Sequence, residues 1–282
     1  MAILETKNLT YTYGAGTPFE KTAVENVNLS VEKGAFVGVI GHTGSGKSTL
    51  IQMLNGLIRP TSGQVLLNGE DIWAKPKEIR RVRFQVGMVF QYPEYQLFEE
   101  TVIKDIMFGP KNMGLSDEEA RKRAKEAAHF TDLKPELLEK SPFELSGGEK
   151  RRAAIAGVIA MQPKCIVLDE PTAMLDPAGR REVIDTATKL CREQGITVVL
   201  ITHHMEECIG ADRVIVLSNG AVVADGAPKQ VFSQVELLKR EGLTAPVTVR
   251  LLHALRAHGM DVPLDALTVS DCADAVAAAL KR

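Results

Sequence analysis

The 282-residue sequence has little of several features that would place it in a special class of protein. It contains no run of about 18 consecutive apolar residues, the length that an α-helix needs to cross a membrane. Its four cysteines are scattered and form no Cys-x-x-Cys pair, which argues against a zinc site or a disulfide framework and fits a reducing compartment. The first residues lack the basic-then-apolar pattern of a secretory signal. We therefore expect a globular protein in the cytosol whose contact with any membrane depends on a partner.

A strong excess of charge of either sign is also missing. The formal net charge is −2 at pH 7 and the isoelectric point is near 6.3, whereas proteins that coat nucleic acid usually carry a large basic excess. We therefore expect no nucleic-acid partner. The hydrophobic fraction of 45% is ordinary for a soluble protein, and the length suffices for one large domain and a small appended one.

A glycine-rich segment, GHTGSGKS from Gly41 to Ser48, is the strongest local signal. It follows an apolar run at 36–40 that predicts a strand and precedes residues that predict a helix. This order lets successive backbone N–H groups and a helix N-terminus face one phosphate, with Lys47 reaching the β- and γ-phosphates and Ser48 ligating Mg²⁺. The alternative is an ordinary glycine-rich turn before a helix. The predicted nucleotide-binding residues here are Gly41, His42, Thr43, Gly44, Ser45, Gly46, Lys47, Ser48 and Thr49.

The pattern of apolar residues around this segment predicts an α/β fold. Two of the predicted strands end in carboxylates or histidines, at the edge where open α/β sheets bind ligands. Asn-Gly pairs mark two of the expected hairpin turns. Strands are expected at 1–33 (two or three), 36–40, 62–72 (a hairpin), 86–91, 165–170, 197–204 and 213–226 (a strand pair).

Two parts of the sequence are predicted to be helical. The segment at about 92–161 is expected to be a helical subdomain inserted into the main domain, which spans 1–228. Within it, Ser116 and Glu119 have the spacing of a capping box before an amphipathic helix. A small C-terminal domain at 229–282 is expected to need a neighbour to bury its apolar faces. Its predicted helices are 231–240, 247–258 and 270–280.

Three later motifs identify a family. LSGGEKRR at 145–152, CIVLDEPT at 165–172 and ITHH at 201–204 resemble, in order and spacing, the ATP-binding cassette family from about residue 3 to about residue 226. The resemblance implies a P-loop NTPase core of the RecA-like type, with an antiparallel β subdomain and the inserted helical subdomain. It also implies an ATPase that uses Mg²⁺ and lies at the cytoplasmic face of the cell membrane as a peripheral subunit.

The resemblance also assigns roles to single residues. Tyr13 is expected to stack on adenine, with Tyr11 as the alternative and cross-strand packing as the non-functional interpretation. Glu170 would polarise the attacking water and His203 would contact the γ-phosphate, while His204 is expected to be a bystander. The implied catalytic residues are Glu170, His203 and Gln91, and the implied metal-binding residues are Ser48, Gln91 and Asp169.

A further set of residues is expected to act on the nucleotide of a second cassette in a head-to-tail dimer. In the family the LSGG segment of one subunit closes over the ATP of the other, and the loop after the catalytic strand contacts the opposite subunit. Glu149 stands where the family usually has Gln, and this extra carboxylate near a polyanion is predicted to weaken closure. The residues implied are Ser146, Gly147, Gly148 and Asp176.

The segment QYPEYQLFEETVIKDIMFGPKN at 91–112 narrows the resemblance to the energy-coupling factor ATPases of vitamin and cobalt or nickel importers. TPFE at 17–20 and LFEETV at 97–102 resemble the second of two paralogous ATPases, and the tail resembles a dimerisation region. The implied partners are a second ATPase subunit, a transmembrane coupling protein and, indirectly, a substrate-binding membrane protein. The coupling protein is expected to dock near Tyr92, Glu94, Tyr95, Phe98, Glu99 and Glu100.

Alternatives remain at this point. The chain could serve another class of importer, or act on nucleic acid in repair or translation, although such cassettes usually carry long insertions or a second cassette. A catalytically inactive interaction module conflicts with the presence of Lys47, Asp169, Glu170 and His203. The transported substrate and the choice between heterodimer and homodimer are left open.

Overall fold

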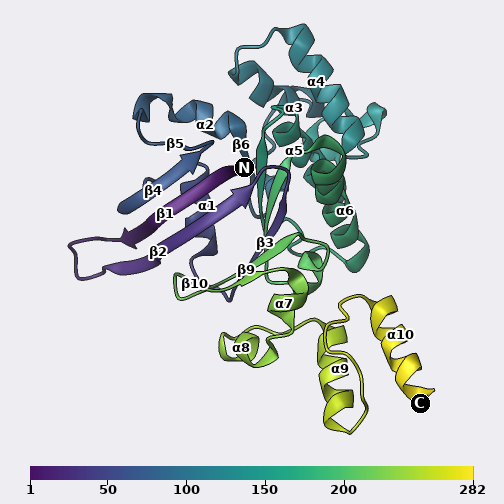
Figure 1. Cartoon of the computed structure of the whole chain (residues 1–282). Helices are drawn as coiled ribbons and strands as arrows, with labels where there is room; N and C mark the ends of the chain where they lie inside the picture. Colours follow the sequence, from purple (N-terminus) through teal and green to yellow (C-terminus); the bar gives the residue numbers. More distant parts are fainter. Residues whose placement is uncertain (282) are drawn as a thin grey trace.

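Two β-sheets form the framework of the molecule, of which the computed structural model describes residues 1–281 (Figure 1). The larger sheet has six strands in the order β10-β9-β3-β8-β7-β6, and all neighbouring pairs are parallel except β10 with β9. Its central strands are buried along their whole length and mostly apolar, because both faces of the sheet are covered. The strands are β3 (Phe36–Ile40), β6 (Val86–Val89), β7 (Cys165–Asp169), β8 (Thr197–Thr202), β9 (Arg213–Ser218) and β10 (Ala221–Gly226).

The smaller sheet is antiparallel and has four strands in the order β2-β1-β4-β5. The first 33 residues form two strands, and the predicted hairpin turns at Asn68 and Gly69, which both have positive φ. This confirms the expected antiparallel strands beside the phosphate loop. The strands are β1 (Ala2–Tyr13), β2 (Lys21–Glu32), β4 (Ser62–Leu67) and β5 (Glu70–Asp71).

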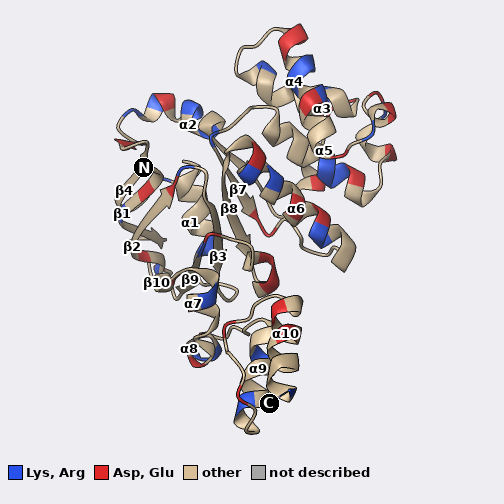
Figure 2. Ribbon diagram, turned by 45° about the vertical axis from the view of Figure 1, so that its right-hand side comes forward, with Lys and Arg blue, Asp and Glu red and all other residues tan. Residues whose placement is uncertain are grey.

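The segment at 92–161 contains helices and no strand, as expected, and lies at the top of Figure 1. Figure 2 shows both acidic and basic residues on its helices. Ser116 accepts a hydrogen bond from the backbone N–H of Glu119 at 3.3 Å, but the Glu119 carboxylate pairs with Arg123, so half of the predicted capping box forms. The helices of the chain up to residue 208 are α1 (Lys47–Leu54), α2 (Ile79–Gln85), α3 (Val102–Asn112), α4 (Asp117–Phe130), α5 (Gly147–Ile159) and α6 (Pro177–Gln194), with short 3-10 helices at Pro76–Glu78, Pro93–Gln96, Pro135–Leu137, Pro142–Glu144 and Met205–Cys208.

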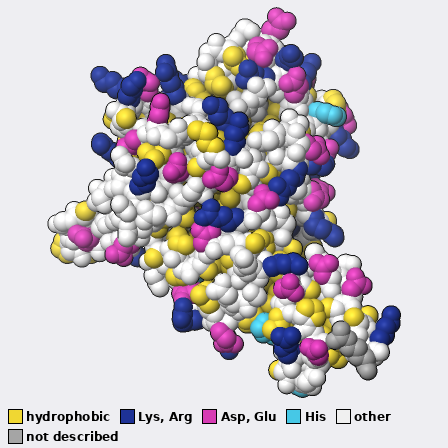
Figure 3. Space-filling view, in the orientation of Figure 1, with side chains coloured by type: hydrophobic (Ala, Val, Ile, Leu, Met, Phe, Trp, Pro, Cys, Tyr) yellow, Lys and Arg dark blue, Asp and Glu magenta, His cyan; other side chains and the backbone are white. Residues whose placement is uncertain are grey.

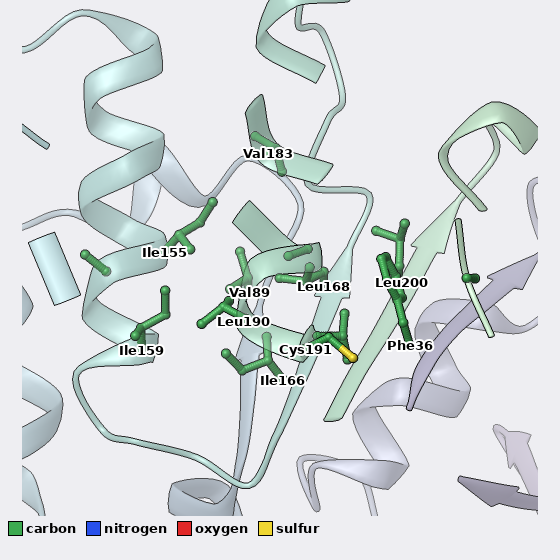
Figure 4. Close-up of a cluster of buried hydrophobic side chains, with 14 of the residues drawn as sticks. Phe36, Val89, Ile155, Ile159, Ile166, Leu168, Val183, Leu190, Cys191 and Leu200 are labelled. Atoms are coloured by element: carbon green, nitrogen blue, oxygen red, sulfur yellow. The ribbon is translucent and has the colours of Figure 1, made fainter. Parts of the chain in front are cut away.

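The hydrophobic core fixes the ends of the parallel strands. One face of the sheet packs against α5 and α6, with Ile155 and Leu190 facing strand residues such as Leu168 (Figure 4). The other face packs against Leu50 of α1 and Leu9 of the antiparallel sheet. Because the strands are held on both sides, the side chains at their carboxyl ends have fixed positions.

The C-terminal region corrects one prediction. The expected helix at 231–240 is two helices, α7 (Pro228–Phe232) and α8 (Val235–Arg240), because Gln234 between them has a ψ of 57° and leaves the helical region. Pro228 also starts the first helix earlier than expected, since proline is favoured at the first helical position. The other two expected helices are α9 (Val247–Ala257) and α10 (Val269–Leu280).

The C-terminal region packs in two parts. Phe232, Leu238 and Val249 belong to the main core, whereas the end of α9, the following loop and α10 form a small cluster that includes Leu252 and Cys272. Figure 3 shows apolar side chains among charged ones on this lobe. The separation of 229–282 as a domain of its own stays a prediction. Among the described helices, none combines the length and the apolar character that a bilayer crossing requires.

Candidate active site

The predicted phosphate loop joins β3 to α1. Gly46 is the N-cap of α1, with a φ of 101°, and no side chain caps the helix. A Cβ atom on Gly46 would lie 2.2 Å from the Ala23 carbonyl oxygen, and one on Gly41 would lie 2.2 Å from the Leu217 carbonyl oxygen. Both glycines are therefore required by the fold, and the first N–H groups of α1 have no side-chain partner.

Lys47 lies within this loop and is only 6% exposed. Its Nζ donates hydrogen bonds to the carbonyl oxygens of Gly41 at 2.7 Å and His42 at 3.0 Å. Burial lowers the pKa of Lys47, and the nearby carboxylates of Glu170 and Asp169 oppose this effect. The ammonium group thus rests on loop carbonyls, within the segment where phosphates are expected.

Asp169 and Glu170 follow the buried run of β7. Asp169 is 7% exposed, and burial, followed by the charge of Glu170, raises its pKa from 3.8 to about 6. A hydrogen bond from Ser48 and the charge of Lys47 act in the opposite direction. A buried carboxylate beside a serine hydroxyl is a donor set that Mg²⁺ accepts, and a bound cation would favour the ionised form. These residues therefore fit the expected metal.

Glu170 brings the three predicted catalytic residues together. Its Oε2 accepts a hydrogen bond from Gln91 Nε2 at 3.2 Å and lies 3.5 Å from His203 Nδ1. Gln91 comes two residues after β6 ends at Val89, so it lies beyond the strand rather than at its end. Glu170 itself has a φ of 45°, a left-handed backbone that is rare outside glycine.

The neighbouring His204 has other contacts. Its Nδ1 lies 3.4 Å from Arg180 Nη1, and burial is the main cause of its lowered pKa. Its backbone N–H donates to Thr202 Oγ1, which in turn donates to the buried carboxylate of Glu207 at 2.6 Å. Thr202 and Glu207 thus shape the turn that presents His203, and no local pattern in the sequence marks either residue.

Tyr13 packs beside Tyr11 of its own strand, and its stacking on adenine stays a prediction. Its ring lies edge-on to Tyr11 with ring centres 4.8 Å apart, a contact within β1 rather than across strands, and Tyr13 is 43% exposed. Its hydroxyl lies 3.1 Å from Thr49 Oγ1 in the helix that follows the phosphate loop. An aromatic face is therefore available beside the predicted nucleotide site.

The LSGG segment forms the capped start of α5. Ser146 donates to Glu149 Oε2 from its N–H at 2.8 Å and from its hydroxyl at 2.7 Å, and these bonds are the main cause of the lowered pKa of Glu149. A Cβ on Gly147 would meet nothing within 4 Å, and one on Gly148 would approach only Arg152. No hydrogen bond or ion pair among residues 1–281 joins this segment to the phosphate loop.

Asp176 has a structural partner in the same chain. It is the N-cap of α6, and its Oδ1 accepts a hydrogen bond from the backbone N–H of Gly179 at 2.8 Å. Its expected contact with a second subunit would add to this role.

Glu94 differs from the expectation that it belongs to an exposed docking segment. Its carboxylate forms a two-pronged ion pair with Arg151, at 3.0 and 2.7 Å, and the two side chains are 17% and 4% exposed. Arg151 also donates to the carbonyl oxygens of Pro171 and Ala173, just after Glu170. Arg151, the first of the two arginines after LSGGEK, therefore joins the segment around Glu94 to the residues that follow Glu170.

Comparison with known proteins agrees with this geometry. Residues 24–173 match the family model described as ABC transporter. The chain is 47% identical over 269 residues to the energy-coupling factor transporter ATP-binding protein EcfA2 of Caldanaerobacter subterraneus subsp. tengcongensis, covering 95% of this chain and 94% of that protein. It is 49% identical to the protein of the same name from Clostridium acetobutylicum, covering 94% of each.

Solved structures give the same result. The chain is similar to cbiO1 from Clostridium perfringens, which is part of the ABC transporter complex cbiONQ, with 37% identity, a TM-score of 0.76, and 91% of this chain and 98% of that chain covered. It is also similar to a dimeric ATP-binding cassette in a post-hydrolysis state bound to ADP and Pi, with 32% identity, a TM-score of 0.72, and coverage of 80% and 98%. The chain therefore belongs to the ABC transporter family of ATPases and, within it, to the energy-coupling factor transporter ATP-binding proteins of the EcfA2 type.

Proposed function

We propose that this chain is the ATP-hydrolysing subunit of an energy-coupling factor importer that takes up a vitamin or a transition-metal ion. The proposal rests on the meeting of Gln91, Glu170 and His203 beside the phosphate loop. Relatives that match nearly the whole chain carry names that support the same role. Uptake would require a membrane coupling protein and a substrate-binding membrane protein.

ATP would bind with its phosphates on the loop between β3 and α1. The uncapped start of α1 and the loop N–H groups would receive the phosphate oxygens. Lys47 would exchange its two carbonyl partners for the β- and γ-phosphates. The exposed side of Tyr13 would stack on adenine.

Ser48, Gln91 and Asp169 would hold the Mg²⁺ of the nucleotide. When bound, the ion supplies positive charge to the β- and γ-phosphate oxygens. The raised pKa of Asp169 supports this assignment, because a buried carboxylate without a cation pays a desolvation cost.

Glu170 would act as the general base toward the attacking water. Gln91 and His203 both lie against the same carboxylate oxygen, Oε2, and so orient the side chain. The other oxygen, Oε1, would be left to accept the proton of the water. His203 is half exposed and could reach the γ-phosphate from this position.

A second ATPase subunit, a copy of this chain or a paralogue, would complete the site. Its Ser146, Gly147, Gly148 and Asp176 would close over the γ-phosphate. The open space in front of both glycines supports this, since nothing in their own chain fills it. Exposed apolar residues on the tail helices, Leu251 and Val269 among them, would help hold the two subunits together.

The membrane coupling protein would dock in a groove of about 590 Å³ beside the segment that follows Gln91. Phe98 and Phe108 line the groove, are 60% and 46% exposed, and contact each other edge-to-face with ring centres 4.9 Å apart. Asp105 fixes the groove rim by accepting hydrogen bonds from the backbone N–H groups of Phe98 and Glu99. Apolar side chains of an amphipathic helix would fill the groove and its basic side chains would meet the rim.

Fewer carboxylates are available for docking a basic helix than the sequence predicted. Glu94 is occupied by Arg151, and Glu100 pairs with Lys104 on its own surface. Within residues 1–281, Glu99 has no ion-pair partner, so we assign it the main role in pairing with a basic helix. The exposed ring of Tyr95 and the partly buried ring of Tyr92, with centres 6.1 Å apart, would extend the contact. Docking at this groove would place the chain at the cytoplasmic face of the membrane as a peripheral subunit.

Co-expression with a candidate transmembrane coupling protein tests the proposal. We expect Phe98→Asp to abolish co-purification from detergent while the ATPase activity of the soluble chain persists. Phe19→Asp, at a residue that is 88% exposed outside the groove, is the matched control and should co-purify normally. Normal co-purification of Phe98→Asp would refute the dock, and stimulation of the ATPase by double-stranded DNA alone would favour a cassette that acts on nucleic acid.

A further inference from the structure

The buried carboxylate of Glu207 is tied to the end of β8. Glu207 is 9% exposed, and its Oε2 accepts a hydrogen bond from Thr202 Oγ1 at 2.6 Å. Thr202 is the last residue of β8 and is also buried, and its hydroxyl oxygen accepts a hydrogen bond from the backbone N–H of His204 at 2.9 Å. The Glu207 N–H in turn donates to the His204 carbonyl oxygen at 3.2 Å. These three hydrogen bonds close a ring around the turn at 203–206.

The same turn packs against the strand that leads into the phosphate loop. Cys208 is fully buried, and a Cβ atom on Gly38 of β3 would lie 2.5 Å from its Sγ. Met205 and Cys208 both belong to the main hydrophobic core. Because the turn is held against β3 at close range, its shape sets the distance between His203 and the phosphate loop.

The ring of His203 is not held in place by burial. Its side chain is 51% exposed, its Nδ1 lies 3.5 Å from Glu170 Oε2, and its ring centre lies 4.1 Å from that of His204. Because half of the side chain faces solvent, packing of the ring cannot by itself fix where it points. The backbone position of His203 is set instead by the hydrogen bonds on either side of it, at Thr202 and at His204.

From this geometry we infer that Glu207 is a positioning residue for His203, acting through Thr202 and the backbone of the turn. The carboxylate takes the proton of the Thr202 hydroxyl and so leaves a lone pair of Oγ1 directed at the His204 N–H. Without Glu207 the hydroxyl is free to rotate, and the turn loses the bonds that fix its first two residues. This role rests on the proposed function in one respect, that His203 takes part in the hydrolysis of ATP.

Steady-state ATPase kinetics of full-chain variants test this role. Glu207→Ala and Thr202→Val should each lower kcat by about tenfold to a hundredfold, the effect of misplacing an active-site group by about 1 Å. The affinity for Mg²⁺-ATP should change much less than kcat, because the phosphate loop supplies most of the binding. If Glu207→Ala does not fold, Thr202→Val carries the same test with a side chain of similar shape.

Conservative variants should restore the rate. Glu207→Gln keeps the one oxygen that Thr202 uses, since the other carboxylate oxygen, Oε1, has no hydrogen-bond partner among residues 1–281. Thr202→Ser keeps the hydroxyl. Both variants should have a kcat near that of the unmodified chain. Glu206→Ala removes the exposed carboxylate one position earlier, and as the matched control it should also leave kcat unchanged.

A double-variant cycle with His203→Ala separates positioning from a general loss of stability. In the His203→Ala background, Glu207→Ala should lower kcat no further, because no imidazole is left to position. The same fold reduction in both backgrounds, or an unchanged kcat in Glu207→Ala and Thr202→Val, would overturn the role of Glu207 while the proposed function stands. If His203→Ala alone hydrolyses ATP at the unmodified rate, the part of His203 in the proposed function fails, and the role of Glu207 fails with it.

Discussion

The molecule contains two glycine-rich segments that each lead into a helix, the phosphate loop at 41–48 and the LSGG segment at 145–148. In the first, Gly41 and Gly46 are packed against backbone oxygens of the same chain, and α1 begins without a side-chain cap. In the second, α5 begins with a complete capping box, and the space in front of Gly147 and Gly148 is open.

The difference shows that two segments of similar composition can have different structural roles. The glycines of the phosphate loop are needed by the fold, which leaves helix N–H groups ready for a ligand. The contacts within the chain do not require the glycines of the LSGG segment, and the proposed function gives them a role in contacting a second subunit. On the proposed function, the phosphate loop would supply one half of a nucleotide site within the chain, and the LSGG segment would supply the other half of a site on a second subunit.

The largest expected effect separates the hydrolysis of ATP from the ATP-driven pairing of two subunits. Glu170→Gln should lower the ATPase rate by about 10²–10⁴, because the amide keeps the shape of the carboxylate but cannot accept a proton. ATP binding and ATP-driven pairing should survive, and pairing can be followed by analytical ultracentrifugation. Lys47→Ala is the contrasting variant and should lose ATP binding itself. Turnover near the unmodified rate in Glu170→Gln would contradict the assignment of the base.

The next effect concerns the ion pair between Glu94 and Arg151, which joins the segment after Gln91 to α5. Glu94→Gln should lower the free energy of unfolding by roughly 3 kcal/mol, because it leaves the buried guanidinium of Arg151 without its charged partner. Glu100→Gln removes an exposed carboxylate close by and should change the free energy of unfolding far less, because water screens a surface ion pair. Chemical denaturation of both variants measures the difference. Equal stabilities would show that Arg151 holds α5 without the help of Glu94.

A third effect depends on pH. The pKa of Asp169 is raised from 3.8 to about 6, so the stabilisation that it gives is complete below pH 3.8 and is lost as the pH rises through about 6. Asp169→Asn removes this dependence. Above pH 6 the nucleotide-free variant should be more stable than the unmodified chain by on the order of 2 kcal/mol, and the gain should shrink as the pH falls.

Denaturation curves of the nucleotide-free proteins from about pH 4 to about pH 8 check this prediction. The asparagine variant should also bind Mg²⁺-ATP more weakly, because it lacks the charged metal ligand. A constant difference in stability across the pH range would show that the charge of Asp169 costs the fold nothing.

The smallest effect tests most directly the comparison between the phosphate loop and the LSGG segment. Gly46→Ala should lower the stability by about 2 kcal/mol, because alanine strains the left-handed backbone and its Cβ would approach the Ala23 carbonyl oxygen. Gly148→Ala should leave the fold intact or raise its stability slightly, since alanine favours a helix. It should nevertheless weaken ATP-driven pairing. Equal destabilisation by both changes would remove the distinction between the two segments.

The sequence predicted those features that depend on local pattern. Apolar runs located β3, β7 and β8, and the motif residues at their ends meet around Glu170 as expected. The end of one strand differs from the expected 86–91: β6 stops at Val89, and Gln91 contacts Glu170 from beyond the sheet.

Contacts between distant segments could not be predicted in the same way. Glu94 and Arg151 are 57 positions apart, and His42 and Ser218 are 176 positions apart, so no periodicity relates them. The break between α7 and α8 was missed because the apolar positions at 231, 235 and 238 fit one continuous helix. Only the packing of Phe232 and Leu238 into the main core requires the chain to bend between them.

The left-handed backbone of Glu170 has a consequence for any attempt to select a more heat-stable variant of this protein. Asparagine and especially glycine hold that conformation with less strain than glutamate, by on the order of 1 kcal/mol. A library screened for heat tolerance alone would therefore be expected to enrich Glu170→Gly or Glu170→Asn, and with either of them to abolish hydrolysis. We expect a carboxylate to be retained at this position only when ATPase activity is selected together with thermal stability.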